Sequence, residues 1–196
     1  GELDEPVSAV LLGDRIDGLH EALIAHGADT VYIARHKALS NYRTAAYTKI
    51  MADLIREYRP GILLMGATHL GRDLAPRLSR RVGVGLTADC IELSIDSESG
   101  ILLQSRPAFG ANVMATIANR YSRPQMATVR PGVMSVVPGA DREGRVIRKK
   151  VSLKEREIGV KVLEQVIEKR RRIDITEASV IVAGGRGVGD AAGFRR

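Results

Sequence analysis

Hydrophobic runs alternate with amphipathic stretches through the first half of the chain. Residues 7–13 look like a buried strand, residues 30–34 form a short β-branched run, and residues 62–67 are apolar at every position, as expected for a strand covered on both faces. Three other stretches repeat apolar residues at intervals of three and four, the spacing of one helical face. These stretches span residues 15–27, 44–60 and 70–83. The alternation predicts a parallel sheet with helices on its faces, joined by right-handed crossovers.

Glycine and proline mark the predicted helix ends. Gly27 follows the first helix at a position that favours a left-handed backbone, and Pro60 closes the second. Pro76 falls within the third helical pattern. Since proline has no backbone N–H, we expect Pro76 in the first turn, where N–H groups lack intrahelical partners anyway.

The pattern changes after Gly85. Short runs with strand composition follow one another, separated by turns rich in Gly, Pro, Asp and Ser. These runs lie at residues 86–95, 101–110, 112–119, 125–132 and 146–153. We expect them to complete and extend the sheet, so the predicted fold is a three-layer α/β/α arrangement with a mostly parallel sheet and a strand-rich second half.

The stretch from Ile158 to Arg172 has two interpretations. Its first apolar residues alternate as in a strand, whereas those from Leu163 to Ile167 have helical spacing. We favour the strand and keep the helix as the alternative. Asp174 and Glu177 then have the spacing of a capping box, which predicts a short turn or helix acting as a hinge.

A glycine-rich turn near the end of the chain is the strongest candidate for a binding site. The apolar run ASVIVA, residues 178–183, predicts a strand that leads directly into AGGRGVGD. Glycines let the backbone approach a pyrophosphate without Cβ collisions, and their N–H groups can face the anion. Arg186 adds a permanent charge that can fork onto phosphate. The candidate cofactor-binding residues are Gly184, Gly185, Arg186 and Gly187.

Composition narrows the classes of function. Hydrophobic residues make up 44% and charged residues 27% of 196 residues, typical of a folded, soluble chain. Aromatic content is 4% without tryptophan, so stacking of bases on aromatic platforms is not expected. The net charge of +7 is spread over several segments. This distribution favours solvated faces and partner contacts over a nucleic-acid groove, although the basic segment 168–172 keeps an RNA-associated domain as an alternative.

Targeting and redox signals point to the cytoplasm. Cys90 is the only cysteine, so no internal disulfide can form and a reducing compartment fits. No apolar run approaches the roughly 18 residues of a membrane span. The first ten residues lack the basic and apolar regions of a signal peptide.

Catalytic and metal-binding patterns are not found in the sequence. The four histidines lack metal-ligand spacing, and no nucleophile elbow is present, so we predict no catalytic residues and no metal site. His69 follows a predicted strand, where open α/β sheets bind ligands. In the following segment, Arg72 and Asp73 could hold a ligand. We favour structural roles, with Asp73 complementing the helix dipole and Arg72 pairing with a carboxylate.

Five stretches in order resemble the α subunit of electron transfer flavoproteins: GATHLGRDLAPRL, GLTADCIEL, SRPAFGANVMATI, ATVRPGVM and VIVAGGRGVG. The similarity runs from about Val7 to Gly189. It implies an adenine-nucleotide-hydrolase-like α/β domain over residues 1–173, lacking the family's first strand and helix. Residues 174–196 would be a linker and the incomplete beginning of an FAD-binding domain.

The resemblance also implies a function. The protein would be part of an FAD-containing electron carrier that passes electrons from dehydrogenases to an oxidoreductase acceptor, without being a catalyst itself. In the family the arginine of the GGRG turn contacts the FAD, which carries over to Arg186. This portion would mainly dock the β subunit of a heterodimer, through residues 105–119 and 127–134. One corner cannot bury a flavin ring, so we expect this chain alone to bind FAD weakly or not at all.

A stand-alone adenine-nucleotide-binding module of the nucleotide-hydrolase-like class is the alternative function. Enzymes of that class place an SGGxDS-like loop after their first strand. The nearest match here, AGGRGVGD, comes at the opposite end of the chain and lacks the serine and aspartate of that loop.

Overall fold

A computed structural model describes residues 3–108, 110, 112–136, 138–166, 175 and 178–195. The chain divides into two compact units, Gly1–Lys161 and Val162–Arg196. The predicted domain boundary at 173/174 and most of the predicted hinge lie outside the described residues, so both stay predictions.

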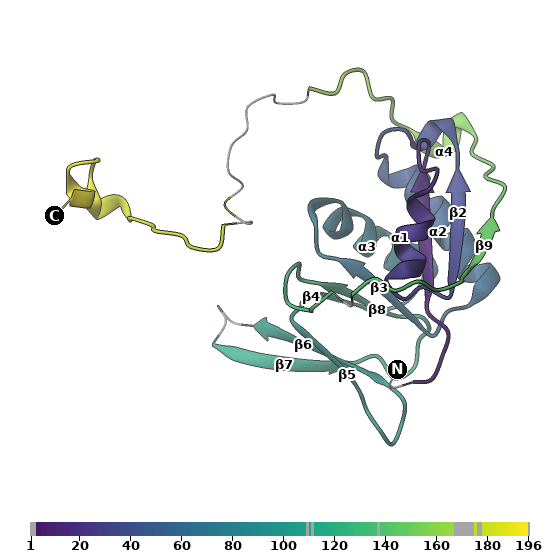
Figure 1. Ribbon diagram of the computed structural model, residues 1–196, viewed down its shortest axis with the longest axis horizontal. Helices are drawn as coiled ribbons and strands as arrows, with labels where there is room; N and C mark the ends of the chain where they lie inside the picture. The colour runs from purple at the N-terminus through teal and green to yellow at the C-terminus, as the bar shows by residue number, and fades with distance from the viewer. Residues whose placement is uncertain are drawn as a thin grey trace. The chain divides into compact units, whose positions relative to one another are not determined.

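Three sheets of three strands each form the framework of the first unit (Figure 1). Two of them are parallel. The first has the order β1 (Ser8–Gly13), β2 (Thr30–Arg35), β9 (Arg145–Arg148), and the second the order β3 (Ile62–Gly66), β8 (Gln125–Val129), β4 (Leu86–Cys90). The third is antiparallel, with the order β5 (Glu92–Ile95), β6 (Leu102–Ala108), β7 (Val113–Ala118).

Helices cover the parallel sheets on two sides. The helical segments of the first unit are α1 (Leu19–Ala25), a 3-10 turn (Lys37–Leu39), α2 (Thr44–Tyr58), α3 (His69–Val82) and α4 (Glu155–Ile158). Leu11 and Ile33 pack against α1, whereas Leu12 and Ala34 pack against the cluster that contains α2. Neighbouring strand residues therefore face opposite helix layers, and the predicted α/β/α architecture is confirmed.

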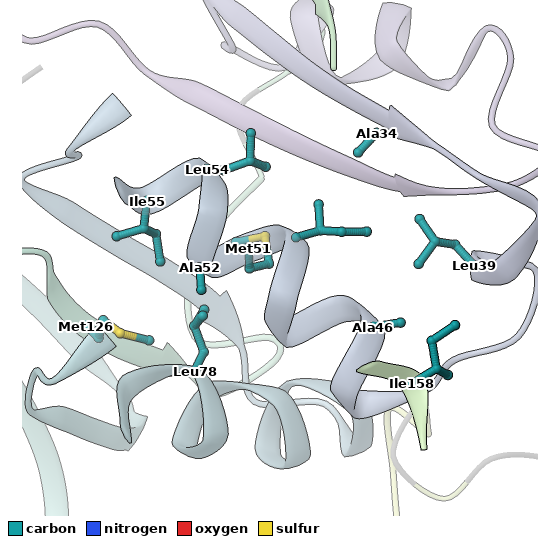
Figure 2. Close-up of a cluster of buried hydrophobic side chains, with 11 residues drawn as sticks. Ala34, Leu39, Ala46, Met51, Ala52, Leu54, Ile55, Leu78, Met126 and Ile158 are labelled. Atoms are coloured by element: carbon teal, nitrogen blue, oxygen red, sulfur yellow. The ribbon is translucent and has the colours of Figure 1, made fainter. Parts of the chain in front are cut away.

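The larger core cluster is built around α2 (Figure 2). Met51, Leu54 and Ile55 of this helix are buried together with Leu78 of α3 and Met126 of β8. Figure 2 shows Leu78 pointing from α3 toward α2. One helix thus contributes apolar cover to strands of both parallel sheets and to a second helix.

Two helix details differ from the sequence prediction. The first helix begins at Leu19 rather than near Arg15, because Gly18 has φ +79° and cannot continue a right-handed helix. Pro76 lies in the interior of α3 and not in its first turn. The helix tolerates the lost hydrogen bond because Thr68 caps its start, Gly83 ends it in a left-handed conformation, and its apolar face is buried.

Two predicted strands are wrong over the residues that the structure describes; residues 167–172 of the first lie outside them. Residues 159–166 and 178–183 have no regular secondary structure. The apolar side chains of the second segment are exposed, with Val180 at 81% and Val182 at 84%. A strand needs a partner to satisfy its backbone groups, and the described residues of the second unit contain no strand that could pair with this segment.

The edge strands are less covered than their composition predicts. The middle strands β2 and β8 are largely buried, but β1 and β3 each have one unpaired edge within their sheets. Leu64, at the centre of the all-apolar run ILLMG, is 48% exposed. The expectation that this strand is covered on both faces therefore holds for one face only.

We predict that Leu78→Ala lowers the free energy of unfolding by about 2–5 kcal/mol, because Leu78 is 0% exposed and its loss leaves a cavity between α2 and α3. Urea denaturation followed by circular dichroism measures the change. Leu70→Ala in the same helix is the matched control; with Leu70 54% exposed, its effect should stay within about 0.5 kcal/mol. Equal losses in the free energy of unfolding for both substitutions would contradict the placement of Leu78 in the core.

Candidate functional site

A cavity of about 230 Å³ lies between α3 and the parallel strands β4 and β8. In open α/β sheets, ligands bind beyond the carboxyl ends of the strands. β3 and β8 end at Gly66 and Val129, close to the start of α3. The cavity is lined by Arg72, Pro76, Leu86, Ala88, Asp89 and Thr128.

Asp89 has an unusual backbone for a strand residue. The pairing of β4 with β8 shifts register between Thr87 and Cys90, and within this bulge Asp89 has φ +62°. Its backbone N–H donates to Thr128 Oγ1 at 2.8 Å instead of to a strand carbonyl. Left-handed backbone at a residue other than glycine costs of the order of 1 kcal/mol, and bulges of this kind are frequent beside functional sites.

Arginines converge on the Asp89 carboxylate. Arg130 donates from Nε to Oδ1 at 3.2 Å and from Nη2 to Oδ2 at 2.6 Å, while Arg72 Nη2 lies 3.5 Å from Oδ1. The hydrogen bond from Arg130 is the main cause that lowers the pKa of Asp89, and the charges of Arg130, Arg72 and Arg106 lower it further. Asp89 is therefore ionised over the whole physiological pH range.

The start of α3 is fixed by contacts that the sequence only partly predicts. Thr68 Oγ1 accepts a hydrogen bond from Gly71 N at 3.2 Å. A Cβ at Gly71 would lie 1.9 Å from the carbonyl oxygen of Gly66, so glycine is required at this position. Arg72 Nε donates to the Ala67 carbonyl at 2.9 Å, which holds its guanidinium beside the strand ends.

Asp73 connects α3 to the beginning of α2. Its Oδ2 accepts hydrogen bonds from the hydroxyls of Tyr42, at 2.7 Å, and Thr44. These bonds lower the pKa of Asp73, with Thr44 the larger cause. Burial and the Asp73 bond raise the pKa of Tyr42 to about 12. Asp73 thus has a structural role, but not the predicted one of complementing the helix dipole, because the first turn of α3 contains no acidic residue and Asp73 instead bonds Tyr42 and Thr44. His69 is an exposed residue of the first helical turn outside the cavity lining.

The four predicted cofactor residues lie in one exposed turn of the second unit. Arg186–Val188 form a 3-10 turn, closed by Val188 N donating to the Gly185 carbonyl at 3.0 Å. A Cβ at Gly184 would meet the Phe194 ring at 2.3 Å, whereas at Gly185 or Gly187 it would meet nothing within 4 Å. In the part of the chain that the structure describes, the Arg186 side chain has no hydrogen bond or ion pair.

Apolar side chains are also exposed on the antiparallel sheet. β7 is an edge strand, and Val113, Met114 and Ile117 on it are all exposed, Met114 at 51%. Ser105 and Thr116 hydroxyls join β6 to β7 at 3.0 Å. After β8, Val133 and Met134 are exposed as well.

The described residues contain neither a metal-binding cluster nor a membrane-spanning helix. No group of three or more His, Cys, Asp or Glu side chains lies close enough together to hold a metal ion. None of the described helices combines the length and the apolar character that crossing a membrane requires.

Sequence reasoning missed the arginine cluster around Asp89. The residue lies in the strand-like run LTADC, and neither its positive φ nor its contact with Arg130, 41 positions later, can be inferred from residue spacing. The pairing of Arg72 with a carboxylate was predicted, but its partner was not.

Comparison with known proteins gives a family match. The electron transfer flavoprotein domain matches residues 1–155. The chain is 48% identical over 193 residues to a FixB protein of Clostridium saccharobutylicum, which covers 98% of this chain and 58% of that protein. It is 48% identical over 189 residues to an electron transfer flavoprotein subunit alpha of Thermoanaerobacterium thermosaccharolyticum, covering 96% and 57%.

A third relative is named for an enzyme system. The acryloyl-CoA reductase electron transfer subunit beta of Anaerotignum propionicum is 35% identical over 204 residues, covering 91% of this chain and 56% of that protein. The chain spans 56–58% of the length of these three relatives.

We predict that Asp89→Asn lowers the free energy of unfolding at pH 7 by about 1.5–3 kcal/mol, the usual contribution of hydrogen bonds to a charged group. Asparagine also tolerates positive φ, so the substitution tests the charge rather than the backbone. Because the folded pKa of Asp89 is lowered, the unfolded chain binds more protons in acid, and the wild type should lose this stabilisation as pH falls below about 4.

Denaturant titrations at pH 7 and pH 3 measure the difference between variant and wild type, which should shrink at pH 3. Asp53→Asn is the control, because its ion pairs with Lys49 and Arg56 are exposed on α2 and should contribute less than about 1 kcal/mol. A difference for Asp89→Asn that does not change between the two pH values would show that its charge is not what stabilises the fold.

Proposed function

Because this chain belongs to the electron transfer flavoprotein family, we propose that it works within the α subunit of an FAD-containing electron carrier. The carrier accepts electrons from a dehydrogenase and passes them to an oxidoreductase acceptor. The observation that carries this proposal is the identity of 48% to an α subunit and to a FixB protein over nearly the whole chain. The third relative is named as an electron transfer subunit of a reductase, which agrees with a carrier that serves separate enzymes.

The glycine turn is suited to hold a flavin nucleotide. Arg186 is exposed and has no local side-chain partner among the described residues, so its guanidinium is available to a phosphate or an electron-rich ring. The open space around Gly185 and Gly187 allows a ligand to reach the backbone. Bound FAD supplies the redox chemistry, while this turn binds and orients it and Arg186 stabilises negative charge.

The first unit is proposed to dock the β subunit. The candidate contact is the edge strand β7, where Val113 and Ile117 are exposed on one side of the sheet and Met114 on the other. With the exposed residues Val133 and Met134 after β8, we call this candidate the β7 edge. Exposed apolar side chains on an unpaired edge strand are typical of protein interfaces. Arg106 and Arg130 lie on the neighbouring strand β6 and at the end of β8, and arginine is enriched at such interfaces.

We predict that this chain alone binds FAD with a dissociation constant weaker than about 1 μM, because one turn covers little of a ligand that a complete pocket would bury by 70–90%. Quenching of flavin fluorescence measures the affinity. A submicromolar constant would contradict the prediction that this turn is only one part of the flavin site.

In the whole α subunit purified with its β partner, Arg186→Gln should weaken FAD binding by at least about tenfold, equivalent to 1.4 kcal/mol. The reduction potential should also fall, because a positive charge that stabilises the reduced flavin is removed. Arg80→Gln, an exposed residue of α3, is the control. Unchanged affinity and potential in the Arg186 variant would exclude this residue from the flavin site.

Docking through the β7 edge is tested separately. Met114→Asp places a charge among exposed apolar residues and should abolish co-purification with the β subunit, while the circular dichroism spectrum stays unchanged. Leu19→Asp, at the exposed first position of α1, should leave co-purification intact. If Met114→Asp retains the β subunit at wild-type yield, docking takes place elsewhere.

A further inference from the structure

The cavity beside Asp89 is not used by the proposed flavin turn, which belongs to the other unit. Three guanidinium groups act on its single carboxylate: Arg130 and Arg72 by direct contact, and Arg106 through its charge. The carboxylate neutralises only one of these charges. The surroundings of the cavity therefore keep a net positive charge that a bound anion could neutralise.

The donors of this cluster are only partly engaged. Arg130 uses Nε and Nη2 on Asp89, and Arg72 uses Nε on a backbone carbonyl and one terminal nitrogen on Asp89. Among the described residues, the half-buried Arg106 side chain makes no hydrogen bond or ion pair. A guanidinium carries five N–H donors in a fork that fits oxyanions, so donors remain for a ligand. The positive end of α3, which starts at Thr68, adds to the attraction.

The bulge in β4 also distinguishes this part of the sheet from an ordinary strand end. An ordinary strand would alternate its side chains, whereas here φ +62° at Asp89 redirects the chain beside the cavity and brings Asp89 N onto Thr128. A strained backbone persists only where the surroundings stabilise it, and such residues cluster at ligand sites. The Asp89 carboxylate, which lines the cavity as Arg72 does, holds the guanidinium groups of Arg72 and Arg130 together and so preorganises them.

The other residues that line the cavity indicate the chemical character of the ligand. Pro76, Leu86 and Ala88 form an apolar wall, opposite in character to the arginines. We propose that this cavity binds a small organic oxyanion, a carboxylate or a phosphate monoester, with its anionic head at Arg72 and Arg130 and its apolar body against Pro76 and Leu86. The proposal is independent of the flavin site.

Phenyl phosphate, benzoate and inorganic phosphate are the probes in ¹H–¹⁵N NMR titrations of this chain at low ionic strength. Saturable shifts are expected at the amides of Ala88, Asp89 and Thr128, and inorganic phosphate should bind at least about threefold more weakly than phenyl phosphate because it lacks an apolar body. Saturation by phenyl phosphate alone identifies a phosphate site, and saturation by benzoate alone a carboxylate site. Shifts that do not saturate with either probe would overturn the proposal.

Substitutions separate a ligand site from a structural cluster. Arg72→Met should weaken binding at least about tenfold, whereas Arg80→Met, in the last turn of the same helix, should not change it. Arg72→Met and Arg80→Met with the same affinity would show that the arginines serve only the fold.

Discussion

Apolar cover from α2 is the constraint on which the rest of the first unit depends. A parallel strand needs hydrophobic contact on both faces, and α2 supplies it to strands of two separate parallel sheets. Ala34 of one sheet and Met126 of the other are buried in the same cluster as Met51. The two sheets share no hydrogen-bonded strand pair among the described residues, so packing against this helix, rather than a continuous ladder, joins them.

The same packing positions the chemistry at the strand ends. α3 is held against α2 by Leu78 in the core and by the bonds of Tyr42 and Thr44 to Asp73 at its first turns. The start of α3 is thereby fixed, and with it Arg72, whose guanidinium reaches Asp89. Packing of Leu78 in the core therefore determines the geometry of the arginine cluster around Asp89. The hydrogen bonds between Arg130 and Asp89 in turn stabilise the strand ends.

Residue patterns predict elements well where local composition and tertiary environment agree. The runs at 30–34 and 125–132 have strand composition, and both form middle strands, β2 and β8, as predicted. The prediction failed where the tertiary surroundings of a segment, rather than its composition, decide its secondary structure. Residues 178–183 have strand composition but no adjacent strand, and α3 accommodates Pro76 because caps and burial outweigh one lost bond. The Asp89 site depends on a backbone angle and a contact across the sheet, and neither has a local signal.

Positive charge alone does not distinguish a binding site on this chain. Arg77, Arg80 and Arg81 are all exposed on α3, so a search by charge would favour them as readily as Arg72. Other cations connect elements: Arg35 pairs with Asp17, and Lys149 with Glu57. Arg72 and Arg130 differ because a bulged strand fixes both to one carboxylate beside a cavity with an apolar wall. Preorganised donors lose little entropy when an anion arrives, whereas mobile surface arginines must first be ordered. Geometry, and not the net charge of +7, is therefore what marks this part of the sheet for a ligand.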